Sequence, residues 1–341
     1  MRTESRPASG PLARAVLSPG PGTNAAIAFL TLLVVAGATL YGALPIGLPD
    51  PVPASAPPTT FSSARALAHV RAIARRPHPM GSPANAAVRD YLVKELRALG
   101  LKPEVQKATA VTCCSHSGAF GAGTPQNVLA RLDGTAKGGK AFLVVAHYDS
   151  VPTGPGASDD GAGVAAMLET IRALKAGPPL RHDVIFLFTD GEEPGMLGAR
   201  AFVNGHPWAK DVGAVLNLEA RGNTGAAHMF ETSDDNGWVI REFAKAAPYP
   251  FGSSGEEAGY KLSGSNTDLT VFMDAGWAGM NVAYAEGITH YHTRLDTVEE
   301  LDERSLQHLG SYVLALTRHF GDADLDHTKA PEEVYFNLLG S

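Results

Sequence analysis

The chain has 341 residues, with 28 basic and 35 acidic side chains and a formal net charge of −7 at pH 7. This length is sufficient for one large α/β domain or two small ones. The sequence contains no basic patch of the kind that binds nucleic acid, so nucleic-acid binding is excluded.

Residues 25–44 read AAIAFLTLLVVAGATLYGAL and carry no charge. A helix of about 20 apolar residues is long enough to cross a bilayer. Arg2, Arg6 and Arg14 precede the segment, and no Lys or Arg follows it before Arg65. The positive-inside rule therefore predicts a cytoplasmic tail at residues 1–24, a transmembrane signal anchor at residues 25–44 and an extracytoplasmic remainder, in the periplasm, outside the cell or in the ER lumen. A cleaved signal peptide is the alternative, although its apolar region is usually only about 7–15 residues long.

Residues 45–60 are dense in proline, which predicts a semi-rigid linker. We expect a globular domain at residues 61–325 and a C-terminal tail at residues 326–341. The two cysteines, Cys113 and Cys114, are adjacent. A disulfide between neighbours is strained, so we expect neither a disulfide framework nor a cysteine zinc site.

Within the globular domain, helical and strand patterns alternate, which predicts a three-layer αβα domain. Two nearly continuous apolar runs, at residues 141–146 and 184–188, are typical of central strands that are buried on both faces. The predicted helices lie at residues 62–75, 82–99, 160–174, after Gly198 and at 299–320, and the predicted strands at residues 127–132, 141–146, 183–188 and 212–218.

The strand that ends near residue 146 is followed by His147 and Asp149. Residues two apart on a strand point to the same face. We therefore expect His147 to bind a metal ion while the Asp149 side chain accepts a hydrogen bond from its other ring nitrogen, an arrangement common around metal-bound histidines. A histidine that merely caps a strand end is the alternative.

Asp159 and Asp160 open the next predicted helix. One carboxylate suffices for an N-cap, so we expect Asp160 to cap the helix and Asp159 to bridge two metal ions. Glu192 and Glu193 follow the strand at residues 183–188, at the carboxyl end where α/β sheets gather ligands. We expect Glu193 to bind metal and Glu192 to act as the general base, although a solvated acidic turn is an ordinary alternative.

Glu219 follows the strand at residues 212–218. We expect it to bind metal, although a charged residue at a strand end is an ordinary alternative. His290 and His292 lie in one polar loop, and from the residues alone either could bind a metal ion. Two histidines and three carboxylates can hold two zinc ions if one carboxylate bridges them, and such a pair is a hydrolytic centre. We call this group the ligand set; its expected members are His147, Asp159, Glu193, Glu219 and His292.

The motifs HYDS, GASDDGAG, TDGEEPGMLGA, NLEARG and YHTRLDT, between His147 and Thr297, together resemble the co-catalytic zinc aminopeptidase family, peptidase family M28. The segments RPHPMGSPAN and SNTDLTVF are similar to those of its endoplasmic reticulum metallopeptidase, or Fxna-like, subgroup. The resemblance covers residues 61–320. Many family members have Asp at the place of Glu219, whereas this subgroup has Glu.

The resemblance implies a zinc exopeptidase fold with a mostly parallel, mixed central sheet. It implies that His147 and Glu219 bind one Zn²⁺, that Glu193 and His292 bind the other, and that Asp159 bridges them. Glu192 would be the catalytic base and Asp149 the support of His147. Arg221, Asn266, Asp268 and His290 are candidates for substrate contacts.

We therefore expect a membrane-anchored, two-zinc aminopeptidase that acts on peptides. Three alternatives stay open: a carboxypeptidase or dipeptidase on the same scaffold, a glutaminyl cyclase, and a receptor-like ectodomain without catalysis.

Overall fold

The computed structural model describes residues 21–42, 47–112 and 121–337, and the chain divides into two compact units, Met1–Gly47 and Leu48–Ser341. Cys113 and Cys114 lie outside the described residues.

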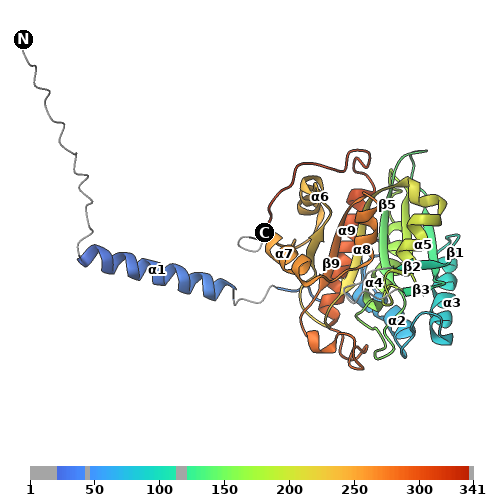
Figure 1. Cartoon of the computed structure of the whole chain (residues 1–341), viewed down its shortest axis with the longest axis horizontal. Coiled ribbons are helices and arrows are strands. Elements are labelled where there is room, and N and C mark those ends of the chain that lie inside the picture. The colour runs from blue at the N-terminus through green and yellow to red at the C-terminus, as the bar shows by residue number, and fades with distance from the viewer. Residues whose placement is uncertain (1–20, 43–46, 113–120, 338–341) are drawn as a thin grey trace, which may run out of the picture. The chain divides into compact units, whose positions relative to one another are not determined.

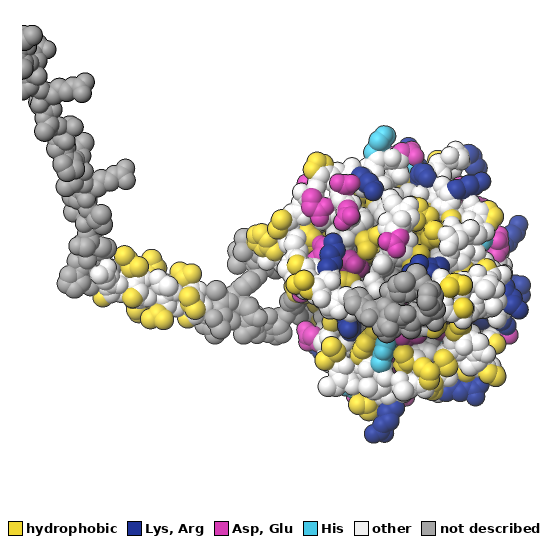
Figure 2. Space-filling view, viewed as in Figure 1, with side chains coloured by type: hydrophobic (Ala, Val, Ile, Leu, Met, Phe, Trp, Pro, Cys, Tyr) yellow, Lys and Arg dark blue, Asp and Glu magenta, His cyan; other side chains and the backbone are white. Residues whose placement is uncertain are grey.

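The first unit contains helix α1 (Pro21–Gly42). Among its residues 24–37, whose side chains the structure describes, the large apolar ones are exposed, as Phe29 and Leu32 are, and Figure 2 shows apolar side chains along this helix. Among the helices that the described residues form, none combines the length and the apolar character needed to span a membrane. The transmembrane anchor predicted at residues 25–44 is therefore not confirmed.

The second unit is built around a seven-stranded mixed sheet with helices on both faces (Figure 1). Its four central strands are parallel, and the strands toward both edges pair antiparallel. The predicted mixed sheet is thus found, although parallel pairing is confined to its centre. The strand order is β1 (Glu104–Lys107), β4 (Gln126–Leu132), β6 (Val184–Thr189), β5 (Ala141–His147), β7 (Val212–Ala220), β9 (Ala278–Tyr284) and β8 (His228–Thr232), while β2 (Ala110–Thr112) and β3 (Gly121–Gly123) form a separate pair.

Side chains of the central strands alternate between two apolar layers. In β5, Phe142 and Val144 belong to one layer, while Leu143 and Val145 belong to the other. Because both faces are covered, every residue of β5 is buried, as its apolar sequence predicts. One face is covered by α2 (Ser63–Ile73), α3 (Pro83–Ala98), α4 (Gly161–Lys175), α6 (Gly237–Ala246) and α9 (Glu303–Phe320), and the other by α5 (Leu197–Gly205), the 3₁₀ helix η1 (Pro207–Asp211) and α8 (Asp268–Asp274).

The remaining elements frame the edge at which the parallel strands end. Helix α7 (Ser254–Ser263) packs beside β8, and the short 3₁₀ helix η2 (Ile288–His290) lies between β9 and α9. Helix α9 begins four residues later than predicted because Asp302 caps it by accepting a hydrogen bond from Arg304 N–H.

The proline-rich segment predicted as a linker belongs to the second unit from Leu48 onward. Arg65 donates hydrogen bonds to the carbonyls of Ala54 (2.7 Å) and Thr60 (2.6 Å), and Arg172 donates to the carbonyl of Pro58 (2.6 Å). Since this segment forms no helix or strand, its carbonyls are free to accept these bonds. The segment therefore packs on the domain rather than spacing it.

The predicted C-terminal tail is also held on the domain over its described part. Ala330 N–H donates to the carbonyl of Asp235 (3.0 Å), and the Tyr335 hydroxyl donates to Glu257 Oε2 (3.0 Å).

Phe61 joins the N-terminal segment to the core. Its buried ring lies against Gly310 of α9, where an added Cβ would come within 1.8 Å of the ring. Gly259 of α7, by contrast, has open space at the same position.

We predict that Gly310→Ala destabilises the fold by about 1–3 kcal/mol through overpacking. Gly259→Ala should instead stabilise it by up to about 1 kcal/mol through helix propensity. Urea denaturation of both variants measures the difference, and equal effects would contradict this packing.

Candidate metal centre

The ends of the parallel strands bring the ligand set together. His147 is the last residue of β5, Glu219 is the second-to-last residue of β7, and Glu193 follows β6 after a short turn. Because the three strands are parallel neighbours, these ends meet at one edge of the sheet. The strand β7 runs through Glu219 rather than ending before it, so this carboxylate has a fixed backbone.

Contacts of His147 define which ring nitrogen faces the centre. Its Nδ1 lies 2.9 Å from the backbone carbonyl of Asp149, which can only accept, so Nδ1 carries the proton. The lone pair of Nε2 then faces Asp159 Oδ1 at 3.1 Å and Glu219 Oε2 at 3.9 Å. Two acceptors facing each other need a cation or a proton between them.

The Asp149 carboxylate, predicted to support His147, lies near the same ring nitrogen but farther from it than the backbone carbonyl does. The carboxylate is 3.7 Å from His147 Nδ1, and its Oδ1 accepts a hydrogen bond from the Glu192 backbone N–H at 3.0 Å. The backbone carbonyl of Asp149 orients the histidine because it is closer, and the carboxylate fixes the turn that carries Glu192.

Asp159 is the central residue of the cluster. Its Oδ1 faces His147 Nε2 and its Oδ2 faces His292 Nε2, each at 3.1 Å. Asp296 holds the backbone of this turn by accepting hydrogen bonds from the N–H groups of Ser158 (2.7 Å) and Asp159 (3.2 Å). One carboxylate therefore faces two histidines with separate oxygens, which is the arrangement of a bridging ligand. Asp160 caps α4 as predicted, through a 3.1 Å hydrogen bond from Gly163 N–H.

His292 and Glu193 complete the second half of the cluster. His292 Nε2 is 3.1 Å from Glu193 Oε2, and the Tyr291 ring stacks on the His292 ring with centroids 3.7 Å apart. Glu193 Oε1 is buried and has no hydrogen-bond partner in the described part of the chain. An unpaired buried carboxylate oxygen is costly unless a cation binds it.

Distances within the ligand set suit zinc. Two ligands with bonds of about 2.1 Å and a tetrahedral angle between them lie about 3.4 Å apart. The separations of 3.1 and 3.9 Å bracket this value. Ligand atoms of His147, Asp159 and Glu193 all lie within 4.8 Å of one another. Imidazole nitrogens and carboxylate oxygens are also ligands that zinc accepts, so these residues fit the metal.

The electrostatics of the cluster favour added positive charge. Burial raises the pKa of Glu219 well above its usual value, and the charge of Glu192 adds to this effect. Burial opposes protonation of His292, yet hydrogen bonds to Asp159 and Glu193 raise its pKa to about 10. Divalent cations would relieve the repulsion among these carboxylates.

Glu192 differs from the ligand set because no hydrogen bond holds its carboxylate in the described structure. Burial raises its pKa well above the usual value, and the nearby negative charges of Glu193, Asp268 and Asp149 act in the same direction. The side chain lines a cavity of about 510 Å³ together with Asp159, Glu193, Glu219 and His292. Such a carboxylate has the affinity for protons that a general base requires.

The residues predicted to contact substrate are placed differently from one another. Arg221 and Asn266 line a second cavity of about 270 Å³ that adjoins the cluster. Asp268 is buried beneath the site, where it accepts a 2.5 Å hydrogen bond from the Thr189 hydroxyl. His290 Nε2 lies 3.5 Å from Glu300 Oε2. Neither Asp268 nor His290 lines either cavity, and their roles as substrate contacts stay predictions.

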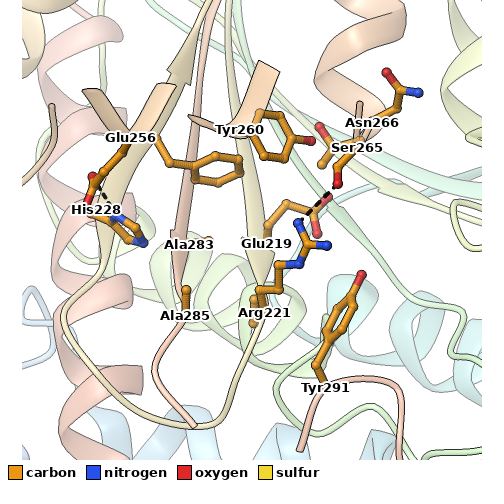
Figure 3. A pocket seen from close by; sticks show the side chains of 13 residues that line it. Glu219, Arg221, His228, Glu256, Tyr260, Ser265, Asn266, Ala283, Ala285 and Tyr291 are labelled. Atoms are coloured by element: carbon orange, nitrogen blue, oxygen red, sulfur yellow. Dashed lines mark hydrogen bonds and ion pairs between the residues drawn. The ribbon is translucent and has the colours of Figure 1, made fainter. Parts of the chain in front are cut away.

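Several residues of the site were not predicted. Tyr291 lines both cavities, and Phe230 and Tyr260 form walls of the smaller one (Figure 3). Aromatic residues in such segments read as core from sequence, so no pattern marked them. Asp296 was recognised only as part of a motif, and its hold on the turn before α4 depends on tertiary contact.

Comparison with known proteins gives the family. Residues 127–317, more than half of the chain, match "Peptidase family M28". The "Vacuolar membrane protease" of Yarrowia lipolytica is 33% identical over 320 residues, which cover 87% of this chain and 32% of that protein. The mouse "Endoplasmic reticulum metallopeptidase 1" is 30% identical over 293 residues, which cover 80% of this chain and 32% of that protein. The chain thus spans about a third of the length that these relatives have.

Solved structures share the fold. "BSAP, a zinc aminopeptidase from Bacillus subtilis" superposes with a TM-score of 0.61 at 16% identity, over 81% of this chain and 100% of that one. The "Porphyromonas gingivalis glutaminyl cyclase" does so with a TM-score of 0.60 at 22% identity, over 75% and 98% of the two chains. The matched residues 127–317 span the positions of the whole ligand set. The relatives confirm the resemblance to the endoplasmic reticulum metallopeptidase subgroup, and this chain belongs to peptidase family M28.

Proposed function

We propose that the protein is a two-zinc aminopeptidase that hydrolyses peptides at their free N-termini. The observation that carries this proposal is the Asp159 carboxylate, each of whose oxygens lies 3.1 Å from a different histidine. His147 and Glu219 would hold one zinc ion, His292 and Glu193 the other, and Asp159 would be shared. The five side chains supply the ligands that two zinc ions require from the protein.

Bound zinc would polarise the peptide carbonyl and lower the pKa of water. Glu192 is the group of this chain placed to move protons. Its carboxylate accepts a proton from the attacking water and returns it to the leaving nitrogen. The hydrogen bond from its backbone N–H to Asp149 keeps the turn in place.

The acidic character of the centre supports action at an amino terminus. Of the carboxylates that line the larger cavity, Glu192 is outside the ligand set, so it is the one that a substrate ammonium group would meet beside the zinc ions. The smaller cavity of about 270 Å³ has the size of a site for one side chain, as an exopeptidase needs. A glutaminyl cyclase would convert N-terminal glutamine without hydrolysing the following bond.

A membrane location is part of the proposal. The exposed apolar side chains of α1 and the names of the yeast and mouse relatives support membrane association of the N-terminal segment. The peptidase unit would then lie on the extracytoplasmic side, as the arginines before residue 25 predict.

Replacement of the proposed base tests the mechanism. We predict that Glu192→Gln retains zinc but lowers kcat by at least about 100-fold, the usual contribution of a general base. Hydrolysis of free-amine and N-blocked peptides, together with zinc content by mass spectrometry, measures both quantities. The exposed Glu299→Gln variant is the matched control. An unchanged kcat in Glu192→Gln would refute this role, and cleavage of blocked peptides would refute the aminopeptidase assignment.

Metal content tests the shared ligand. We predict two zinc ions per chain, about one in Glu193→Gln, and fewer than one in Asp159→Asn because the shared carboxylate serves both ions. A chelator should abolish activity and lower the melting temperature, since a ligand that binds only the folded state stabilises it. Two tightly bound zinc ions in Asp159→Asn would contradict the bridge.

Fractionation tests the location. The full chain should pellet with membranes and resist extraction at high pH, and protease added to sealed cells or vesicles should reach the peptidase unit only from the extracytoplasmic side. A chain that stays in the supernatant would rule out membrane association.

A further inference from the structure

The smaller cavity lies across three neighbouring strands. Glu219 of β7 is in register with Ala283 of β9, and Ala283 is in register with His228 of β8. Residues in register share a face of the sheet, so these three side chains form a row. The middle member is only a methyl group, which leaves a trough between Glu219 at one end and His228 at the other.

Apolar groups form the walls of this trough. The rings of Phe230 and Tyr260 stand edge to face with centroids 4.8 Å apart. Ala285 extends the wall beyond Ala283, on the side away from Tyr260 (Figure 3). Tyr291 lies at the end nearest the metal centre and also lines the larger cavity. A side chain that enters from the centre therefore passes along apolar surface.

The far end of the trough carries a charged pair. His228 Nδ1 contacts Glu256 Oε2 at 3.0 Å, and Glu256 lies in the first turn of α7. Glu256 therefore brings a carboxylate to this end of the trough. Among the described residues, no lysine or arginine lines this end of the cavity.

The cation in the cavity lies at the opposite end. Arg221 Nη1 donates to the Ser265 hydroxyl at 3.2 Å, and its guanidinium lies 5.4 Å from the centre of the Tyr291 ring. Figure 3 shows Arg221 beside Glu219 and Ser265, away from His228 and Glu256. The trough thus runs from Arg221 and Glu219, through an apolar middle, to the carboxylate of Glu256.

We propose that this cavity binds the side chain of the substrate's N-terminal residue and selects a long one that ends in an amine or guanidinium, with Glu256 as the specificity-determining residue. The proposal rests on the aminopeptidase function proposed above. Two strand spacings, about 10 Å, separate the ends of the row, so a long side chain is needed to reach from the centre to Glu256. Lysine and arginine also have apolar stems that suit the walls.

Two substrates that differ by one group test the selection. Lysine 4-nitroanilide and norleucine 4-nitroanilide share the same carbon stem, and only lysine has the terminal amine. The zinc-loaded full chain at pH 8 should prefer lysine by about tenfold in kcat/KM, the effect of one charge-assisted hydrogen bond. This comparison needs no variant, so a folding defect cannot obscure it. An equal or greater rate with norleucine would overturn the proposal.

The variant Glu256→Gln should reduce the lysine preference to about one. The control is Glu242→Gln, which alters another carboxylate paired with a histidine, 2.6 Å from His319 Nε2, outside both cavities. The control should keep the preference. A lysine preference that survives in Glu256→Gln would assign selectivity elsewhere and overturn the role of Glu256. Cleavage of other free-amine peptides but of neither anilide would overturn the selection alone, whereas failure to cleave any free-amine peptide would overturn the aminopeptidase function itself.

Discussion

The arrangement of the whole site depends on the Asp159 carboxylate, which lies between His147 and His292 with one oxygen toward each. The two histidines come from distant parts of the chain, and no direct hydrogen bond joins them. Asp159 keeps its position because Asp296, from the loop that also carries His292, accepts hydrogen bonds from the N–H groups of the turn before α4. The same loop therefore supplies one ligand and fixes the shared one.

The sheet explains why such a concentration of acids is tolerated. Four parallel strands end at one edge, and their apolar bodies are buried on both faces, so the polar residues can gather only where the strands stop. Burial raises the pKa values of Glu192, Glu193 and Glu219, whereas histidine contacts lower that of Asp159. The cluster is thus costly without cations and well suited to hold them.

The smaller cavity lies beside the metal centre, along the sheet beyond β7. Small residues at Ala283 and Ala285 of the β9 region open a trough, and α7 brings Glu256 over its far end. Around the domain, the N-terminal proline-rich segment and the described part of the C-terminal segment pack onto the helices through arginine, tyrosine and backbone hydrogen bonds. Both segments therefore stabilise the domain that holds the site, although neither has a regular sequence pattern.

The sequence by itself determined the layered α/β fold, the central strands and the candidate ligands. A strand made of a long apolar run needs a central place in a sheet that is covered on both faces. Acidic or histidine residues directly after such a run must then lie at a strand end. Only the tertiary structure decided that the Asp149 carbonyl rather than its carboxylate orients His147, that Asp268 and His290 lie outside the cavities, and that residues 48–60 pack on the domain. These outcomes depend on contacts between residues far apart in the chain, for which local periodicity and residue type carry no signal.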